Sequence, residues 1–385
     1  MRRICVFFLL CALFFCFSGI VAGEIGEFVV EDEEELVAPD TRRQARALLG
    51  RMSDDEKIYQ LFFVSLEDLT GEDRAWHIHD ASLLERYPVG GVILFGQNIV
   101  SETQLIQLTE ALRTQAKKAG IYPLFIGVDE EGGNVSRVAN KLGYPLAASP
   151  GEIGNTGNAA LARQAGEEIA GYLLPLGINM TFAPPADTVI DKAQAGVQTY
   201  GTDAALVSQI ASAMAEGLKS GGILPCYTHF PGHGEKTGNT SNNLSVRRML
   251  EEMRAVEFVP FRNAVAEGAD MILISHAIVR ATGDDMPAST SKQVITGILR
   301  GELGFDGVIV TDALRMSAVT SYYKTGQESV AALKAGADLL LLPPDFHAAV
   351  RAVKQALATG ELTWPRIEES VERILAVKIK MGWIQ

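Results

Sequence analysis

Residues 120–137 read GIYPLFIGVDEEGGNVSR, and this stretch carries the pattern that decides the fold. The apolar run at 123–128 has the length and composition of a buried strand. It follows the segment Glu102 to Ala119, whose spacing of apolar residues favours an amphipathic helix. The strand ends in acidic residues and a glycine pair. The stretch therefore predicts a helix–strand unit of a parallel sheet, with polar groups at the carboxyl end of the strand.

The same unit recurs in both directions along the chain. Short apolar runs rich in β-branched residues lie near 58–64, 89–95, 123–128, 178–183, 223–228, 270–275, 307–311 and 338–342. Amphipathic stretches separate them, which is typical of parallel βαβ units. The eight runs predict an α/β fold, a single (β/α)8 TIM-type barrel with its active site at the carboxyl ends of the strands. An open doubly wound sheet is the alternative, but Gly132 and Gly133 lack the spacing of a dinucleotide-binding loop.

The amino-terminal residues have the pattern of an export signal. Arg2 and Arg3 precede an uncharged stretch that ends in small residues before Glu24. An uncleaved anchor through residues 4–23 is the alternative, because about 20 apolar residues can span a bilayer. We therefore expect a secreted or extracytoplasmic protein, either free or anchored to a membrane. The expected order is a signal peptide or anchor, an acidic spacer and the barrel, at residues 1–23, 24–44 and 45–385.

Composition narrows the class of partner. The formal net charge of −13 argues against nucleic-acid binding, which requires a basic face. Three of the four cysteines lie in the predicted export segment, which leaves only Cys226. A chain without that segment therefore has no intramolecular disulfide, although export usually permits one.

Ionisable residues stand where several of the predicted strands end. They are Asp129 with Arg137 close behind, Asp187, His229 with His233 and Glu235, His276 and Asp312. A lone Asp after a strand is often only the N-cap of the next helix. Caps do not require His or Arg, so the recurrence predicts a polar pocket at one end of the barrel. Several carboxylates with few basic residues suit glycoside hydrolysis, whose transition state is cationic.

A metal site is the alternative use of the same residues. His229, His233 and Asp312 could supply two imidazoles and a carboxylate. His233, however, lies in a glycine-flanked turn and is interpreted as bracing that loop. We expect neither a metal ion nor an organic cofactor.

Five motifs occur in order over about residues 45–385: ILFGQN at 93–98, GVDEEGG at 127–133, GINMTFAPPAD at 177–187, HFPGHG at 229–234 and VTDALRM at 310–316. Together they resemble glycoside hydrolase family 3, and most of all its β-N-acetylhexosaminidase branch. The resemblance implies a barrel fold and a carbohydrate substrate. It also implies release of terminal β-linked N-acetylhexosamine from cell-wall-type or related glycans.

The resemblance also implies roles for individual residues. In this family the Asp of the VTDAL segment is the nucleophile of a retaining mechanism, and it corresponds to Asp312. The Asp of GVDEEGG and the Arg eight residues later bind sugar hydroxyls, which gives this role to Asp129 and Arg137. The first His of HFPGHG also binds the sugar and corresponds to His229.

Several family residues are replaced in this chain. The Asp-x-His pair that supplies the general acid/base in this branch corresponds to Asn239, Thr240 and Ser241. The Lys before HFPGHG is Thr228, and the Arg of an RSFG-like segment is Gln198. The usual acid/base, its partner and two cationic sugar contacts are therefore absent together.

Two hypotheses follow from these replacements. In the first, the chain is a hydrolase in which Glu235 has become the acid/base, since it is ionisable and lies on the same glycine-rich loop. Failing Glu235, another pocket carboxyl such as Glu130, or a protonated water, would serve. In the second, the chain is a non-catalytic or weakly active sugar-binding homologue. Retention of Asp312 favours the first, because a pure binder needs no nucleophile.

Overall fold

The structure is a computed structural model that describes residues 41–190, 198–232 and 245–384. Each of the eight predicted strand positions contains a strand: β1 (Phe62–Ser65), β2 (Gly91–Leu94), β3 (Phe125–Val128), β6 (Met180–Thr181), β7 (Leu224–Pro225) continued by β8 (Tyr227–Phe230), β10 (Met271–Ile274), β12 (Val308–Thr311) and β13 (Leu340–Leu341). The first prediction began too early, because residues Asp54–Tyr59 form helix α2. A capping box between Ser53 and Glu56 starts that helix, and this signal outweighs the apolar run that follows.

The strands of the two main sheets all pair in parallel. Six of them form a sheet in the order β13-β1-β2-β3-β6-β7, and three more form a sheet in the order β12-β10-β8. Isolated parallel bridges, Pro185 with Thr228 and Val310 with Leu339, connect the two sheets at both junctions. The chain is therefore an α/β fold built on a curled parallel sheet. Because the strands are parallel, their carboxyl ends lie along one edge.

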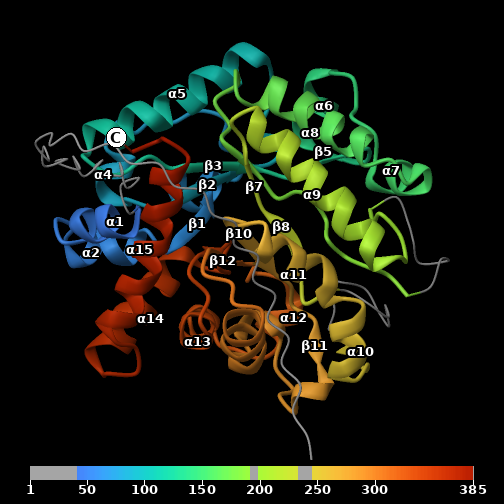
Figure 1. Cartoon of the computed structure of the whole chain (residues 1–385). Helices are drawn as coiled ribbons and strands as arrows, with labels where there is room; N and C mark the ends of the chain where they lie inside the picture. The colour runs from blue at the N-terminus through green and yellow to red at the C-terminus, as the bar shows by residue number, and fades with distance from the viewer. Residues whose placement is uncertain (1–40, 191–197, 233–244, 385) are drawn as a thin grey trace, which may run out of the picture. The chain divides into compact units, whose positions relative to one another are not determined.

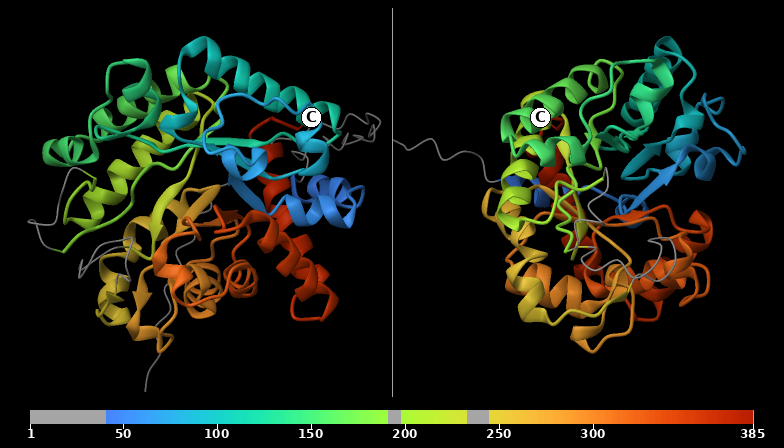
Figure 2. Two further views of the ribbon diagram at one scale, coloured as in Figure 1. Left: turned by 180° about the vertical axis from the view of Figure 1, so that it is seen from behind. Right: turned by 90° about the vertical axis from the view of Figure 1, so that its right-hand side faces the viewer.

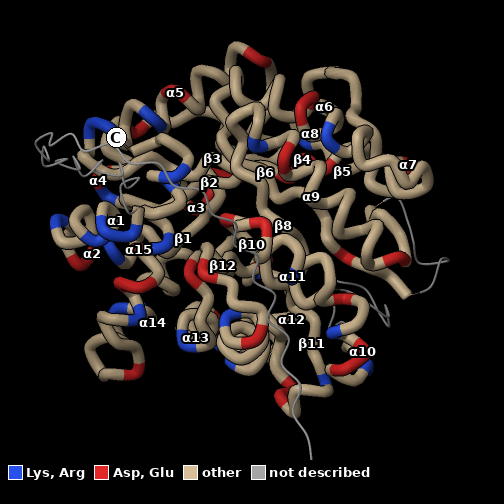
Figure 3. The backbone as a smooth tube through the Cα atoms, in the orientation of Figure 1, with Lys and Arg blue, Asp and Glu red and all other residues tan. Residues whose placement is uncertain are grey.

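Helices lie outside the strands in all three views (Figures 1 and 2). The longer α-helices are α1 (Thr41–Leu49), α5 (Glu102–Lys118), α8 (Ala159–Leu173), α9 (Ala204–Ser220), α11 (Phe258–Ala266), α13 (Gln327–Ala335), α14 (Phe346–Ala358) and α15 (Trp364–Lys380). The shorter ones are α2, α3 (Leu66–Thr70), α4 (Leu83–Arg86), α6 (Arg137–Leu142), α7 (Pro150–Thr156), α10 (Leu250–Ala255) and α12 (Ser317–Thr320). Lys, Arg, Asp and Glu are interspersed along these outer helices (Figure 3).

The remaining elements are short or irregular. They are the 3₁₀ turns η1 (Gly96–Asn98), η3 (Arg280–Thr282) and η4 (Ala288–Thr290), and the π-helical segment η5 (Gln293–Glu302). Four short strands lie outside the main sheets: β4 (Glu130–Gly132) pairs antiparallel with β5 (Val135–Ser136), and β9 (Ser245–Val246) pairs with β11 (Ile278–Val279). The sequence did not predict these pairs, because each strand is too short to show an alternating pattern.

The core inside the curled sheet depends on large and small residues facing one another. The ring of Phe63 lies 6.2 Å from that of Phe125 and 5.5 Å from that of Phe182. A Cβ added at Gly127 would lie only 2.7 Å from Cζ of Phe63, and one at Gly91 would lie 2.9 Å from Cβ of Phe125. Glycine at 127 therefore makes room for the Phe63 ring, as interior layers of small barrels require.

Charged residues of the last helix fasten the amino ends of the strands. The buried Asp338, at the start of β13, forms ion pairs with Arg300, Arg366 and Arg373. The buried Lys378 of α15 donates to Oε1 of Gln60 at 2.9 Å, and its Nζ lies 4.9 Å from the centre of the Phe125 ring. These buried polar contacts hold α15 against the end of the sheet opposite to the polar residues predicted above.

Helix α1 begins at Thr41 and so crosses the predicted spacer boundary at residue 44. Its residues Ala45 and Leu49 are buried, and Arg42 donates to the carbonyl of Asp306 at 2.6 Å. Within the part of the chain that the structure describes, no helix is both long and apolar enough to span a membrane. Residues 1–23 and 24–40, predicted as export segment and spacer, lie outside the described residues.

Candidate active site

Asp312 stands immediately after the buried strand β12. Its backbone N–H donates to the carbonyl of Ile274 at 2.8 Å, which continues the ladder between β12 and β10. Its Oδ1 accepts from the N–H of Ala313 at 2.7 Å. The side chain is half-buried and faces a cavity of about 250 Å³. This volume is slightly below the ~300 Å³ at which pockets for drug-sized ligands begin. It suits a ligand of about one sugar ring.

Asp129 and Arg137 form an ion pair in the same cavity. Asp129 follows β3, and the hairpin of β4 and β5 returns the chain so that Arg137 Nη2 lies 3.5 Å from Asp129 Oδ2. Burial raises the pKa of Asp129, Arg137 opposes that rise, and the neighbouring Asp312 carboxylate adds to it. Asp129 and Asp312 are therefore close electrostatic neighbours, although β3 and β12 belong to different sheets.

His229 pairs with Asp187 on the next strands along. Its Nδ1 lies 2.8 Å from Oδ2 of Asp187, which is buried after β6. Burial alone would lower the pKa of His229. The Asp187 carboxylate, its hydrogen bond, and the carboxylates of Asp312 and Glu131 outweigh burial and raise that pKa to about 9. At neutral pH His229 is therefore an imidazolium that can donate charge-assisted hydrogen bonds.

The adjacent residues Glu130 and Glu131 serve different purposes. Glu130 is fully buried and accepts from the N–H groups of Val138 and Ala139, at 2.8 and 3.0 Å, and from the hydroxyl of Tyr172 at 2.8 Å. It therefore fixes the start of helix α6 and does not line the cavity. The hypothesis that Glu130 replaces the acid/base is not supported by this position.

Glu131 points the other way, because successive side chains of a strand face opposite sides. It lines the cavity with Asp312 and His229. Burial raises the pKa of Glu131 to about 8, His229 and Arg137 oppose the rise, and Asp129 and Asp187 add to it. The sequence showed both glutamates but not which one faces the cavity. The strand period could have separated them if β4 had been predicted.

The other predicted residues divide into three groups. His276 lines the cavity, but its Nδ1 contacts Ser289 Oγ at 2.8 Å and its Nε2 the carbonyl of Ala313 at 3.0 Å, so it braces the turn after Asp312. Thr228 and Gln198, which replace the family Lys and Arg, also line the cavity. A third group lies outside the described residues: His233, Glu235, Asn239, Thr240 and Ser241.

The structure gives no metal centre within the described ranges, where no three His, Cys, Asp or Glu side chains converge to hold an ion. The alternative set of His229, His233 and Asp312 includes a residue outside those ranges. Asp187 is the partner that the sequence did not assign to His229. It ends the GINMTFAPPAD motif at a strand end, but only the pairing of β6 with its neighbours brings it to the imidazole.

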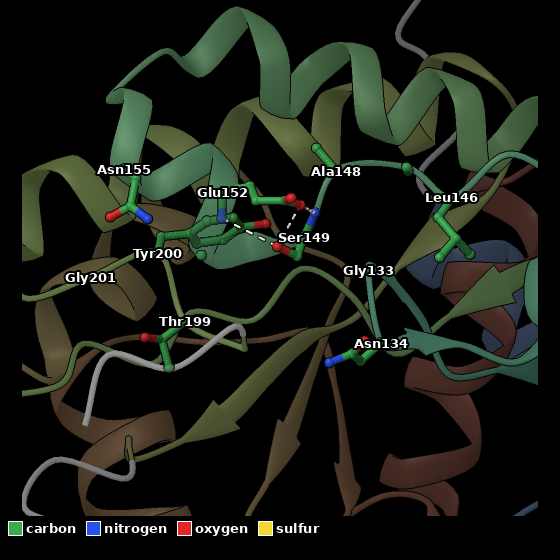
Figure 4. Close-up of a pocket in the computed structure, with 12 residues that line it drawn as sticks. Gly133, Asn134, Leu146, Ala148, Ser149, Glu152, Asn155, Thr199, Tyr200 and Gly201 are labelled. Carbon is green, nitrogen blue, oxygen red and sulfur yellow. Dashed lines mark hydrogen bonds between the residues drawn. The ribbon is translucent and has the colours of Figure 1, made fainter. Parts of the chain in front are cut away.

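A larger cavity of about 880 Å³ adjoins the first and shares Thr199 with it. Asn134 and Thr199 lie on the side of the strands, and Glu152 and Asn155 of helix α7 lie opposite (Figure 4). Glu152 accepts from the N–H and hydroxyl of Ser149, both at 2.8 Å, as a capping box. Glu152 is the one carboxylate among the described lining residues of the larger cavity, and it is held in this way. We therefore assign the chemistry to the smaller one.

Comparison with known proteins identifies the family. The sequence profile described as "Glycosyl hydrolase family 3 N terminal domain" matches residues 53–377. The Mycobacterium tuberculosis protein named Beta-hexosaminidase LpqI is 30% identical over 85% of this chain and 83% of its own length. An Arthroderma benhamiae protein named "Uncharacterized secreted glycosyl hydrolase" is 32% identical over 76% of this chain and 86% of its own.

Solved structures agree with these sequence matches. The family 3 β-N-acetylglucosaminidase of Paenibacillus sp. str. FPU-7 superposes with a TM-score of 0.80 at 33% identity, over 86% of this chain. The present chain spans 63% of that protein's length. The motifs at the strand ends, the parallel sheet and the matched profile lead to one conclusion: the chain belongs to glycosyl hydrolase family 3.

Proposed function

We propose that this protein is a retaining glycosidase that releases terminal β-linked N-acetylhexosamine from cell-wall-type or related glycans. The observation that carries the proposal is Asp312, a carboxylate at the end of β12, in a cavity of sugar size beside the Asp129–Arg137 and Asp187–His229 pairs. Arg137 and His229 are donors suited to sugar hydroxyls. The names of the relatives, beta-hexosaminidase and β-N-acetylglucosaminidase, support the choice of sugar.

The proposed reaction has two displacements at the anomeric carbon. In the first, a carboxylate oxygen of Asp312 bonds to the anomeric carbon, the glycosidic C–O bond breaks, and the leaving oxygen takes a proton from the acid. In the second, water attacks that carbon and loses a proton to the same group, now a base, and the bond to Asp312 breaks. Asp129, Arg137 and His229 hold the ring so that its anomeric carbon meets Asp312.

Glu235 remains the proposed acid/base. Among the described residues, Glu130 is engaged at the start of α6, whereas Glu131 lines the cavity and is the other carboxyl group to be tested in this role. The adjoining cavity around Asn134 and Asn155 is of a size and polarity to receive the rest of the glycan on the leaving-group side. A sugar-binding homologue without efficient hydrolysis is the second candidate, and the replacement of the family Asp-x-His by Asn239, Thr240 and Ser241 favours it.

Asp312→Asn tests the proposal directly. The purified protein should hydrolyse 4-nitrophenyl N-acetyl-β-D-glucosaminide, and the variant should lose that activity by at least about 10³-fold, because an amide cannot form the glycosyl ester. Release of nitrophenolate measures the rate, and calorimetry with N-acetylglucosamine measures binding by both proteins. Binding without turnover of any aryl glycoside by the wild type would select the non-catalytic homologue. Neither binding nor turnover would refute both.

We further propose that the two sheets close into one (β/α)8 barrel. Support comes from the two bridges and from hydrogen bonds beside them, such as the N–H of Thr311 to the carbonyl of Leu339 at 3.0 Å and the N–H of Thr228 to the carbonyl of Pro184 at 3.0 Å. Slow amide exchange at Thr228 and Thr311, equal to that inside β3, is the expected result. Exchange as fast as at an exposed sheet edge would contradict closure.

We also propose export, with residues 1–23 as signal peptide or anchor and with the acidic spacer, predicted at 24–44, ending before helix α1 begins at Thr41. The uncharged stretch after Arg3 and the word "secreted" in the name of the Arthroderma relative support this order. Determination of the amino-terminal residue of the exported protein tests it. A new terminus near Glu24 indicates a cleaved signal, and retention of Met1 in the membrane fraction indicates an anchor.

A further inference from the structure

The acids of the small cavity outnumber its bases. Within the described residues its lining has four carboxyl groups, Asp129, Glu131, Asp187 and Asp312, and two cations, Arg137 and His229. Each cation is already paired, Arg137 with Asp129 at 3.5 Å and His229 with Asp187 at 2.8 Å. Glu131 and Asp312 have no ion pair to any described residue.

Two basic residues of the family pattern are replaced by neutral residues in this cavity. Thr228 and Gln198 replace the Lys and Arg that the family pattern has there, and both side chains line this cavity. With those two cations, the described lining would hold four acids and four bases. In this chain the same places hold neutral hydroxyl and amide groups, so the described lining keeps four carboxyl groups against two cations.

Two buried hydroxyls in the same cavity are without partners. Oγ1 of Thr228 and Oγ1 of Thr199 have no hydrogen-bond partner among the described residues, although the two residues are only 1% and 5% exposed. A buried polar atom left unpaired costs about 1–3 kcal/mol, so a ligand group that bonds to it is favoured. Both hydroxyls can accept a hydrogen bond as well as donate one.

A primary ammonium group matches this combination. It carries one positive charge and three N–H donors, which suit one unpaired carboxylate and neighbouring hydroxyl acceptors. In a 2-amino sugar the ammonium is on the carbon next to the anomeric carbon. Asp312 is committed to the anomeric carbon, so Glu131 is the carboxylate left for the amine. An acetamide, in contrast, is neutral and would leave the charge of the cavity unbalanced.

We propose that the cavity also accepts hexosamines with a free, charged 2-amino group, paired with Glu131 and hydrogen-bonded to Thr228, and that the protein hydrolyses such β-hexosaminides in preference to N-acetylated ones. The inference rests on the proposed glycosidase function and uses the same bond changes: Asp312 replaces the leaving oxygen at the anomeric carbon, and water then replaces Asp312. Burial raises the pKa of Glu131 to about 8 although His229 and Arg137 oppose the rise, and an ammonium bound beside it would further stabilise its ionised form.

The test compares two aryl substrates that differ only in the acetyl group, 4-nitrophenyl β-D-glucosaminide and 4-nitrophenyl N-acetyl-β-D-glucosaminide. We expect the wild type to have the higher kcat/KM for the glucosaminide at neutral pH and to lose that preference at alkaline pH, where the amine is uncharged. Thr228→Lys and Gln198→Arg should each lower the ratio of glucosaminide to N-acetylglucosaminide kcat/KM by roughly 10- to 100-fold, because a like charge then faces the ammonium.

Two further variants guard against misfolding and general charge effects. Glu131→Gln removes the unpaired carboxylate without adding bulk, and it should lower kcat/KM for the glucosaminide by more than that for the N-acetyl substrate. Thr320→Lys makes the same exchange as Thr228→Lys at an exposed residue that lines neither cavity. It should keep the wild-type ratio within about twofold, since solvent and salt screen the charge of an exposed side chain.

The outcomes separate this inference from the proposed function. Cleavage of the N-acetyl substrate alone, or a ratio unaffected by Glu131→Gln and Thr228→Lys, overturns the inference and leaves the glycosidase intact. If neither substrate is cleaved, the proposed function fails, and calorimetry with methyl β-D-glucosaminide and its N-acetyl counterpart then decides the inference. Tighter binding of the glucosaminide that Glu131→Gln abolishes supports it, and equal or absent binding refutes it.

Discussion

At His229 the imidazole and the Asp187 carboxylate lie 2.8 Å apart, and this pair sets the charge that a sugar would meet. Asp187→Asn keeps an oxygen acceptor but removes the largest of the negative charges that together raise the pKa of His229 from 6.5 to about 9. We expect the pKa of His229 to fall in the variant. If the imidazolium is the binding form, activity is lost as pH rises through that pKa, so the alkaline limb should move to lower pH.

The measurement is kcat/KM for an aryl glycoside from pH 6 to 10, with the titration of His229 followed by NMR. The control is Asp129→Asn, which removes a carboxylate that pairs with Arg137 rather than with His229. An alkaline limb that stays in place in Asp187→Asn, with a lower His229 pKa by NMR, would show that the charge of His229 does not limit the reaction.

Glu235 has its own signature if it is the acid/base. Glu235→Gln should slow a chitobiose-like substrate by about 10²-fold or more but slow aryl glycosides much less, because an aryl leaving group needs little protonation. Added azide should restore turnover of the aryl substrate and give a β-glycosyl azide, since a small anion needs no base. Equal rates of wild type and variant on the disaccharide would remove Glu235 from the mechanism.

Among the elements, the β4–β5 hairpin directs the adjacent residues Glu130 and Glu131 to opposite sides, Glu130 to the start of α6 and Glu131 to the cavity. Glu130→Ala removes three hydrogen bonds at the start of α6 and leaves the Val138 and Ala139 amides unpaired, so it should lower the free energy of unfolding by about 3 kcal/mol. Glu131→Gln breaks no described hydrogen bond and should leave that free energy unchanged or raise it. Urea unfolding of both variants is the measurement. A similar decrease in the free energy of unfolding in both variants would contradict the assignment of Glu130 to structure and Glu131 to the cavity.

The same hairpin shows where prediction from sequence succeeds and where it fails. Every main strand was located, because apolar runs such as 123–128 and 307–311 have the length and composition of buried strands. The strand ends then indicated Asp129, His229 and Asp312, which do line one cavity. Three-residue β4 shows no period, so the opposite directions of Glu130 and Glu131 could not be predicted. The pairing of Asp187 with His229 depends on contacts between strands that no local pattern records.

Over the whole molecule, charged groups are used differently at the two ends of the strands. At the carboxyl ends they face a cavity, and at the amino ends Asp338 and Lys378 fasten helix α15. Burial lowers the pKa of Lys378 from 10.5 to about 7 in the folded protein. Between these two pH values the unfolded chain binds more protons than the folded one, so this group makes stability increase as pH rises from 7 to 10.5.

Lys378→Met should remove that increase, because it leaves no group to titrate at this site. The measurement is the free energy of unfolding in urea at pH 7, 8 and 9. As pH rises, the free energy of unfolding of the wild type should increase relative to that of the variant. Lys380→Met is the matched control, since Lys380 pairs with Asp270 at 2.6 Å and is half exposed. A difference between Lys378→Met and wild type that is constant across this range would contradict the buried-amine interpretation.

The contact between Phe63 and Gly127 has a consequence for the history of the family. A Cβ at 127 would lie 2.7 Å from the ring of Phe63, so residue 127 cannot gain a side chain while this ring keeps its size and place. Substitutions at the two sites should therefore be inherited together: relatives that carry alanine or serine at 127 should carry a smaller side chain than phenylalanine at 63. The GVDEEGG motif begins with this glycine. Packing in the interior would therefore preserve the glycine, and ligand binding would preserve the acidic residues that follow it. In relatives that no longer bind the sugar, the acidic residues of the motif would then be free to change while Gly127 stays.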